Sequence, residues 1–177
     1  MALRPHFLPT AALAAALLAA GPAAAKNLGC TQFMDAYNGA AGEHRVTFSR
    51  ALTVGRTAEA GHDYFDASGG DVDVTVVCRG DRFVRLEVRA ATPVPARVDS
   101  RFTRLQQAGV QVAAGGDRTR AGGVVRSLTR EADEYLRGSQ ERGDHYVAGK
   151  VERHMSGGID LAMIATETDR TFIIVNY

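Results

Sequence analysis

Residues 71–90 read DVDVTVVCRGDRFVRLEVRA and decide the fold. Apolar and polar side chains alternate along both halves of this stretch, which is the two-residue period of a β-strand. Between the halves, Arg79-Gly80-Asp81 combines a glycine that tolerates positive φ with an aspartate that can hydrogen-bond its own backbone. The stretch therefore predicts a β-hairpin with strands at 71–78 and 82–90.

The residues before the hairpin predict one helix and two further strands. Thr31 is suited to cap a helix over 31–41, whose apolar residues recur at helical spacing, and Gly42 follows as a stop signal. From residue 43 the apolar period changes to two, which predicts a strand over 44–54 and a short strand over 62–67. We therefore expect one helix followed by four strands that pair in sequence order.

The residues after the hairpin predict two helices and then three strands. Two prolines, Pro93 and Pro95, end the first group of strands because proline cannot donate to a strand ladder. Apolar residues then step by three and four, and Arg97, Arg101 and Arg104 fall on the outer side of the first helix. In chain order, the expected helices are 97–113 and 120–137, the latter stopped by Gly138, and the expected strands are 145–153, 159–166 and 171–176.

The last strand contains the run Phe172-Ile173-Ile174-Val175, which is continuously apolar. Such a run is typical of a central strand that is covered on both faces. The whole pattern predicts a single α+β domain over 26–177, with helix and meander in 31–91 and two helices and a meander in 97–177. We expect one mostly antiparallel sheet of about seven strands, in two meanders, with three helices packed on one face.

The first 25 residues have the organisation of a secretory signal peptide. Arg4 supplies a positive start, residues 11–20 form an apolar run of Ala and Leu, and Ala23-Ala24-Ala25 is a small-residue cleavage site. The apolar run is shorter than the roughly 20 residues that a membrane span requires. We therefore predict cleavage after Ala25 and a periplasmic or secreted destination.

The charge of the chain is balanced, which argues against nucleic acid as a partner. The sequence has 21 basic and 20 acidic residues, and Arg4 is the only charged residue of the leader, so its loss leaves 20 of each. A nucleic-acid-binding protein is expected to carry a basic excess on one face, whereas here the two signs are interspersed.

Cys30 and Cys78 are the two cysteines of the chain. An even number of cysteines in an exported chain favours a disulfide, which would tie the first helix to the hairpin. A lipid anchor on Cys30 is disfavoured because Asn27 stands where an apolar residue is expected, and the spacing is not that of a Cys-x-x-Cys redox pair.

Motifs for catalysis or for cofactor binding are missing from the sequence. No serine has the Gly-x-Ser-x-Gly setting of a hydrolase nucleophile, and no glycine-rich stretch ends in the Gly-Lys-Ser/Thr of a phosphate loop. The histidines lack the spacing of a helical metal pair. Arg79-Gly80-Asp81 spells an adhesion tripeptide, but a hairpin turn favours the same residues. We therefore expect no catalytic residue, no cofactor and no metal.

Two groups of residues remain as weak ligand candidates. His62, Tyr64 and Asp66 share one face of a short strand, where three such groups can bind a metal or share a proton, although a solvated edge strand also explains them. Arg82, Arg85 and Arg89 crowd the second hairpin strand, where guanidinium groups can bind an anion or can simply protect a sheet edge.

The sequence thus favours a non-enzymatic, exported accessory domain that binds a protein or an envelope component. The alternative is a small-anion-binding or hydrolytic protein with a site near His62 and Asp66 and the hairpin arginines. The two hypotheses differ in whether these side chains converge on one pocket.

Overall fold

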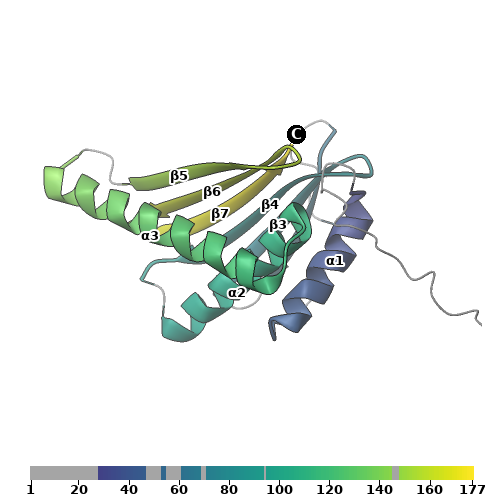
Figure 1. Cartoon of the computed structure of the whole chain (residues 1–177), viewed down its shortest axis with the longest axis horizontal. Helices are drawn as coiled ribbons and strands as arrows, with labels where there is room; N and C mark the ends of the chain where they lie inside the picture. The colour runs from purple at the N-terminus through teal and green to yellow at the C-terminus, as the bar shows by residue number, and fades with distance from the viewer. Residues whose placement is uncertain (1–27, 47–52, 55–60, 69–70, 94, 145–147) are drawn as a thin grey trace, which may run out of the picture.

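The computed structural model describes residues 28–46, 53–54, 61–68, 71–93, 95–144 and 148–177 (Figure 1). Within this part of the chain, three helices and seven strands follow one another in two groups, each of which is a helical segment followed by strands. In chain order they are α1 (Cys30–Glu43), β1 (Thr53–Val54), β2 (Asp63–Ser68), β3 (Val72–Arg79), β4 (Arg82–Ala91), α2 (Ala96–Ala114), α3 (Arg118–Arg142), β5 (Ala148–Met155), β6 (Ile159–Thr166) and β7 (Asp169–Asn176).

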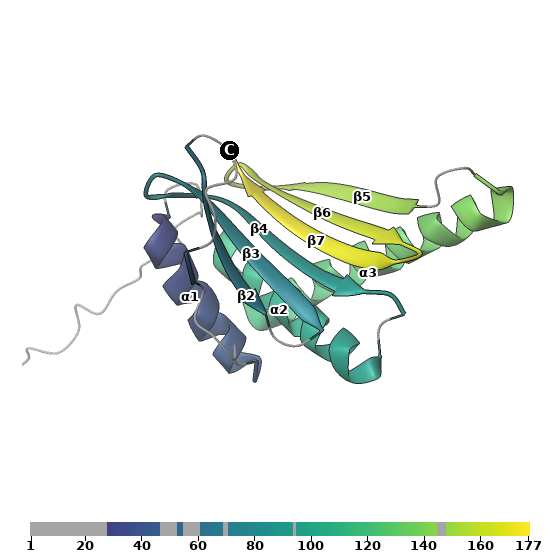
Figure 2. The ribbon, with the colours of Figure 1, turned by 180° about the vertical axis from the view of Figure 1, so that it is seen from behind.

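The strands form one antiparallel sheet in the order β1-β2-β3-β4-β7-β6-β5. The two meanders lie side by side, and they meet where β4 pairs with β7, with Arg85 opposite Val175 (Figure 2). The predicted α+β class is confirmed. The expected number of full strands is slightly too high, because β1 has only two residues.

The hairpin predicted from residues 71–90 is confirmed as β3 and β4. Val72, Val74 and Val76 are buried and lie opposite Ala90, Val88 and Leu86, so the apolar sides of both strands face the core. The register shifts between Val77 and Cys78, which marks a β-bulge near the turn. The bulge places Cys78 opposite Phe83 and directs both side chains into the core.

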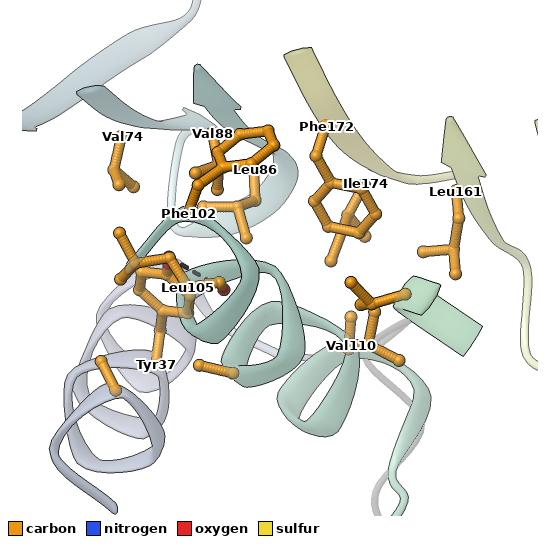
Figure 3. Close-up of a cluster of buried hydrophobic side chains, with 14 of the residues drawn as sticks. Tyr37, Val74, Leu86, Val88, Phe102, Leu105, Val110, Leu161, Phe172 and Ile174 are labelled. Carbon is orange, nitrogen blue, oxygen red and sulfur yellow. Dashed lines mark hydrogen bonds between the residues drawn. The ribbon is translucent and has the colours of Figure 1, made fainter. Parts of the chain in front are cut away.

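All three helices lie on one face of the curved sheet, as the two opposite views show (Figures 1 and 2). Between the helices and the sheet is one hydrophobic core, in which α2 contributes Phe102 and Leu105 and the sheet contributes Leu86, Phe172 and Ile174 (Figure 3). Each of these side chains is at most 1% exposed. Burial of this apolar area is the main term that holds the helices on the sheet.

The disulfide between Cys30 and Cys78 is present and joins the start of α1 to the end of β3. Beside it, the rings of Phe33 and Phe83 stack with their centroids 3.6 Å apart. The bridge and the stack hold α1 against the hairpin. In the described part of the chain, no helix combines the length and the apolar character needed to cross a membrane.

The strand predicted over 44–54 is largely wrong where the structure describes it. Residues 44–46 end α1 instead, and only Thr53–Val54 form a strand; residues 47–52 lie outside the described part. The helix also begins earlier than predicted, with Gly29 rather than Thr31 at the cap position. It continues through Gly39 and Gly42 because Ala40 and Ala41 on its other side are buried in the core, so packing outweighs the glycine penalty.

The second predicted stop, Gly138, is also wrong, because α3 continues to Arg142. The helix ends at Gly143, whose φ of 68° is the left-handed conformation that glycine adopts without strain. The expected strand over 145–153 appears as β5 from Ala148 to Met155, and residues 145–147 lie outside the described part.

The helix α3 lies unusually close to β5 at Gly149. A Cβ atom placed on Gly149 would overlap the carbonyl oxygen of Ala132 and would lie 2.7 Å from the backbone nitrogen of Leu136. The absence of a side chain therefore allows the helix and strand backbones to touch.

Candidate functional site

The sheet has a second face, opposite the three helices, which we call the open face. Strand alternation directs Phe172 and Ile174 of β7 into the core and places Ile173 and Val175 on the open face, where they are half-buried. The prediction that β7 is central is correct, but none of the three described helices covers its second face. The apolar run therefore supplies apolar side chains to both faces.

Four apolar side chains adjoin one another on the open face, and we call them the β6–β7 stripe. Ile173 of β7 lies opposite Ala162 of β6, and Val175 and Ile164 extend the group along the two strands. All four are half-buried. The stripe is two strands wide, which corresponds to about 10 Å across the sheet.

Charged residues border the stripe on both sides. On β4, Arg85, Glu87 and Arg89 lie opposite Val175, Ile173 and Thr171 of β7. On β5, Lys150, Glu152 and His154 lie opposite Ile164, Ala162 and Asp160 of β6. Each border therefore alternates a basic or imidazole group with a carboxylate. The arrangement gives the open face an apolar centre and a polar rim.

The border side chains are held by ion pairs. The Arg89 guanidinium lies 2.7 Å from the Asp169 carboxylate, and the Lys150 ammonium lies 2.7 Å from the Glu152 carboxylate. His154 contacts Asp160 through its Nδ1 atom. At least one side chain of each pair is largely exposed, so the pairs contribute little to stability, but they restrict where the charges can point.

Tyr64 and Asp66, two of the residues singled out in the sequence, lie on β2 near one edge of the sheet. Tyr64 lies opposite Val77, which in turn lies opposite Arg85, so a whole strand separates Tyr64 from the arginine. Asp66 accepts a hydrogen bond of 2.6 Å from the Thr75 hydroxyl. These two residues therefore share a sheet with the hairpin arginines without meeting them at one point.

The remaining candidates are also separated from one another. His62 immediately precedes β2, and its Nδ1 atom is buried without a hydrogen-bond partner in the described part of the chain. Arg82 is exposed at the turn of the hairpin, where its backbone bridges to Gly29. Arg89 is already paired with Asp169. The six candidate side chains do not surround a common cavity among the clefts described below.

The largest of these clefts, about 800 Å³, lies between α2 and α3, and Arg170 of β7 is among the residues that line it. The Arg170 Nη2 atom donates to both carboxylate oxygens of Asp133, at 2.9 and 3.1 Å, and its Nη1 atom lies 3.5 Å from Asp99. One guanidinium thus connects both helices to the sheet. Because two carboxylates already engage it, we interpret this cleft as a structural junction.

Another junction connects α3 to β5. The Ser127 hydroxyl donates to the Glu131 carboxylate at 2.5 Å, and Arg153 of β5 donates to the same carboxylate at 2.9 Å. The hydrogen bond from Ser127, together with Arg153, holds the pKa of Glu131 below its usual value.

A second cleft, of about 640 Å³, separates α1 from the end of α2 and is lined mainly by small residues such as Ala36, Gly39 and Gly115. In the residues that the structure describes, no group of three or more His, Cys, Asp or Glu side chains could hold a metal ion. Within the described residues, neither of these two clefts therefore contains a metal-ligand set.

Comparison of the chain with protein-family models, with curated proteins and with solved structures finds no significant match. Sequence reasoning missed the open face, although a signal was present: Ile173 and Val175 stand at positions whose alternation places them away from the predicted helices.

Proposed function

We propose that the protein is an exported, non-enzymatic binding module that recognises a protein or an envelope component through the open face of its sheet. The observation that carries the proposal is the β6–β7 stripe. Ile173 and Val175 are partly accessible apolar side chains on a face that no described helix covers. An apolar centre with a polar rim is the usual anatomy of a protein interface.

The borders support a protein partner over a small molecule. Each border carries both signs of charge, so a partner must present complementary charges on both sides of an apolar ridge. A small ligand is normally enclosed in a concave pocket, whereas the stripe lies on a sheet surface. The separation of His62, Tyr64 and Asp66 from the hairpin arginines also weighs against the hydrolytic or small-anion alternative.

The proposed destination outside the cytoplasm is supported by two features. The leader over 1–25 has the organisation of a signal peptide, and the disulfide between Cys30 and Cys78 is stable in an oxidising compartment.

Site-specific photocrosslinking in the native host tests the proposal. A photoreactive residue at Ile164, within the stripe, should form a discrete crosslinked species with one protein. The same residue at Tyr135, which is 62% exposed on α3, should not form that species. Equal crosslinking from both positions, or none from Ile164, would contradict a binding role for the open face.

Two variants that introduce a lysine supply the matched control. Ile173→Lys places a charge inside the stripe and should abolish the crosslink from Ile164. Glu141→Lys introduces the same side chain on an exposed position of α3 and should preserve it. Circular dichroism and the unfolding temperature of both variants must first match those of the wild type.

A further inference from the structure

A third cleft, lined by four arginines, lies between the end of α1 and the first half of α2. Its volume is about 230 Å³, and the residues around it are Arg45, Val46, Arg97, Ser100, Arg101 and Arg104. We call it the arginine cleft. None of the residues that form the β6–β7 stripe or its borders contributes to it.

The helical period explains why three of the arginines converge. Arg97, Arg101 and Arg104 are separated by four and three residues, so they lie along one side of α2, with Ser100 between them. Like charges at these spacings repel one another and destabilise a helix. The three arginines therefore lower the stability of α2 relative to uncharged side chains at the same positions.

Some arginines of the cleft have no acidic partner in the described part of the chain. Arg97 lies 3.6 Å from Asp71, and both side chains are largely exposed. In the described part of the chain, Arg45 and Arg104 make no ion pair, and Asp99, the acidic residue nearest in sequence, faces Arg170 instead. Within the described residues, Arg45 and Arg104 therefore bring two positive charges to the cleft that no carboxylate pairs with.

Arg45 enters the cleft from an unusual backbone conformation. Its φ of 60° makes it the non-glycine residue with a positive φ in the described part of the chain. The amide of Arg45 donates to Gly42, and the amide of Val46 donates to Ala41, which is the hydrogen-bond pattern that closes a helix around a left-handed residue. Glycine is strongly preferred at this position because a side chain is strained there.

We propose that the arginine cleft binds a phosphate-bearing anion. A phosphate group offers several acceptor oxygens and nearly two negative charges, so it can engage more than one guanidinium at once. The cleft is smaller than the roughly 300 Å³ at which pockets for whole drug-sized ligands begin. It therefore fits a phosphate head group while the rest of the ligand stays outside. Binding of this ligand explains why Arg45 occupies a backbone position that usually prefers glycine.

The test measures the affinity of pyrophosphate for the purified chain by calorimetry, at constant ionic strength. We expect saturable binding to the wild type. Arg104→Gln should weaken the affinity about tenfold, the effect of one lost charge-assisted hydrogen bond. Arg126→Gln, a control on α3 outside the arginine cleft, should leave the affinity unchanged.

Arg45→Gly separates binding from folding. This variant removes the strained side chain, so we expect a higher unfolding temperature together with a weaker affinity for pyrophosphate. A structural role for Arg45 predicts the opposite change in stability. The site is thus tested by two quantities that should move in opposite directions.

A second measurement distinguishes a soluble ligand from a lipid head group. Co-sedimentation with phosphatidylglycerol vesicles, compared with phosphatidylcholine vesicles, should show Arg104-dependent binding if the source is an anionic lipid. Pyrophosphate binding without vesicle binding assigns a soluble phosphate ligand. Absence of both, or binding that Arg45→Gly and Arg104→Gln leave unchanged, overturns the proposal.

Discussion

Cys30 and Cys78 are joined by a disulfide across 48 residues of sequence, with their Cα atoms 5.8 Å apart. The bridge restricts the unfolded chain, so replacement of both cysteines by serine should lower the free energy of unfolding by about 2–4 kcal/mol. Urea denaturation measures the loss. Reductant should destabilise the wild type by a similar amount and leave the double variant unaffected. Free thiols in the unfolded, unreduced protein would contradict the prediction.

The Tyr37 hydroxyl makes a polar contact within the hydrophobic core. Its hydroxyl donates to the carbonyl of Leu105 at 3.3 Å, and the ring is fully buried (Figure 3). Tyr37→Phe should therefore lower the free energy of unfolding by about 1 kcal/mol. Tyr135→Phe, on the exposed side of α3, should have no measurable effect. A larger loss of unfolding free energy in Tyr135→Phe than in Tyr37→Phe would contradict the burial of Tyr37 and the exposure of Tyr135.

The same residue predicts a loss of stability at alkaline pH. Burial raises the pKa of Tyr37 well above 10, the usual tyrosine value, so the unfolded chain loses this proton first as the pH rises. Stability should be complete below pH 10 and should fall above it, by up to about 1.4 kcal/mol per pH unit. Urea midpoints between pH 8 and 11 should show a weaker dependence in Tyr37→Phe than in the wild type.

Gly149 and Gly123 form a matched pair for the contact of α3 with β5. Gly149→Ala forces a Cβ atom into the backbone of α3 and should destabilise the protein by about 3 kcal/mol or more. Gly123→Ala adds the same atom where nothing lies within 4 Å and should stabilise α3 by up to about 1 kcal/mol. Thermal unfolding of both variants measures the contrast, and equal effects would exclude a close approach at Gly149.

Ile174 and Ile173 are neighbours in sequence whose side chains lie on opposite faces of β7. Ile174→Ala should cost about 2–5 kcal/mol because the side chain is 0% exposed in the core. Ile173→Ala should cost less, since part of that side chain is already in contact with solvent, but it should weaken the photocrosslink from Ile164. A larger loss of stability at Ile173 would indicate that further chain covers the open face.

The hairpin could be predicted from the sequence because its information is local. A period of two in β3 and β4, and a glycine turn between them, identify both strands without knowledge of the core. Helix ends were less predictable. Gly42 and Gly138 are stop signals by propensity, but tertiary packing of their helical neighbours carries α1 and α3 beyond them.

The candidate sites depended on relationships that a linear pattern does not contain. The register of β4, β7 and β6 decides that Ile173 lies between Glu87 and Ala162. The convergence of Arg45 with the arginines of α2 depends on how α1 ends, which was predicted incorrectly. The sequence predicted that Arg97, Arg101 and Arg104 share the outer side of one helix. It did not predict that Arg45 lies beside them.

The pairing of β4 with β7 also affects the chain while it folds. These strands come from distant parts of the sequence, so the first meander can form before residues 169–176 pair with it. During that interval, β4 has an unpaired edge that could recruit another chain. Arg85, Glu87 and Arg89 then lie along this edge as charged residues that discourage such pairing. We therefore expect the side chains that border the stripe in the folded protein to protect the folding chain from aggregation as well.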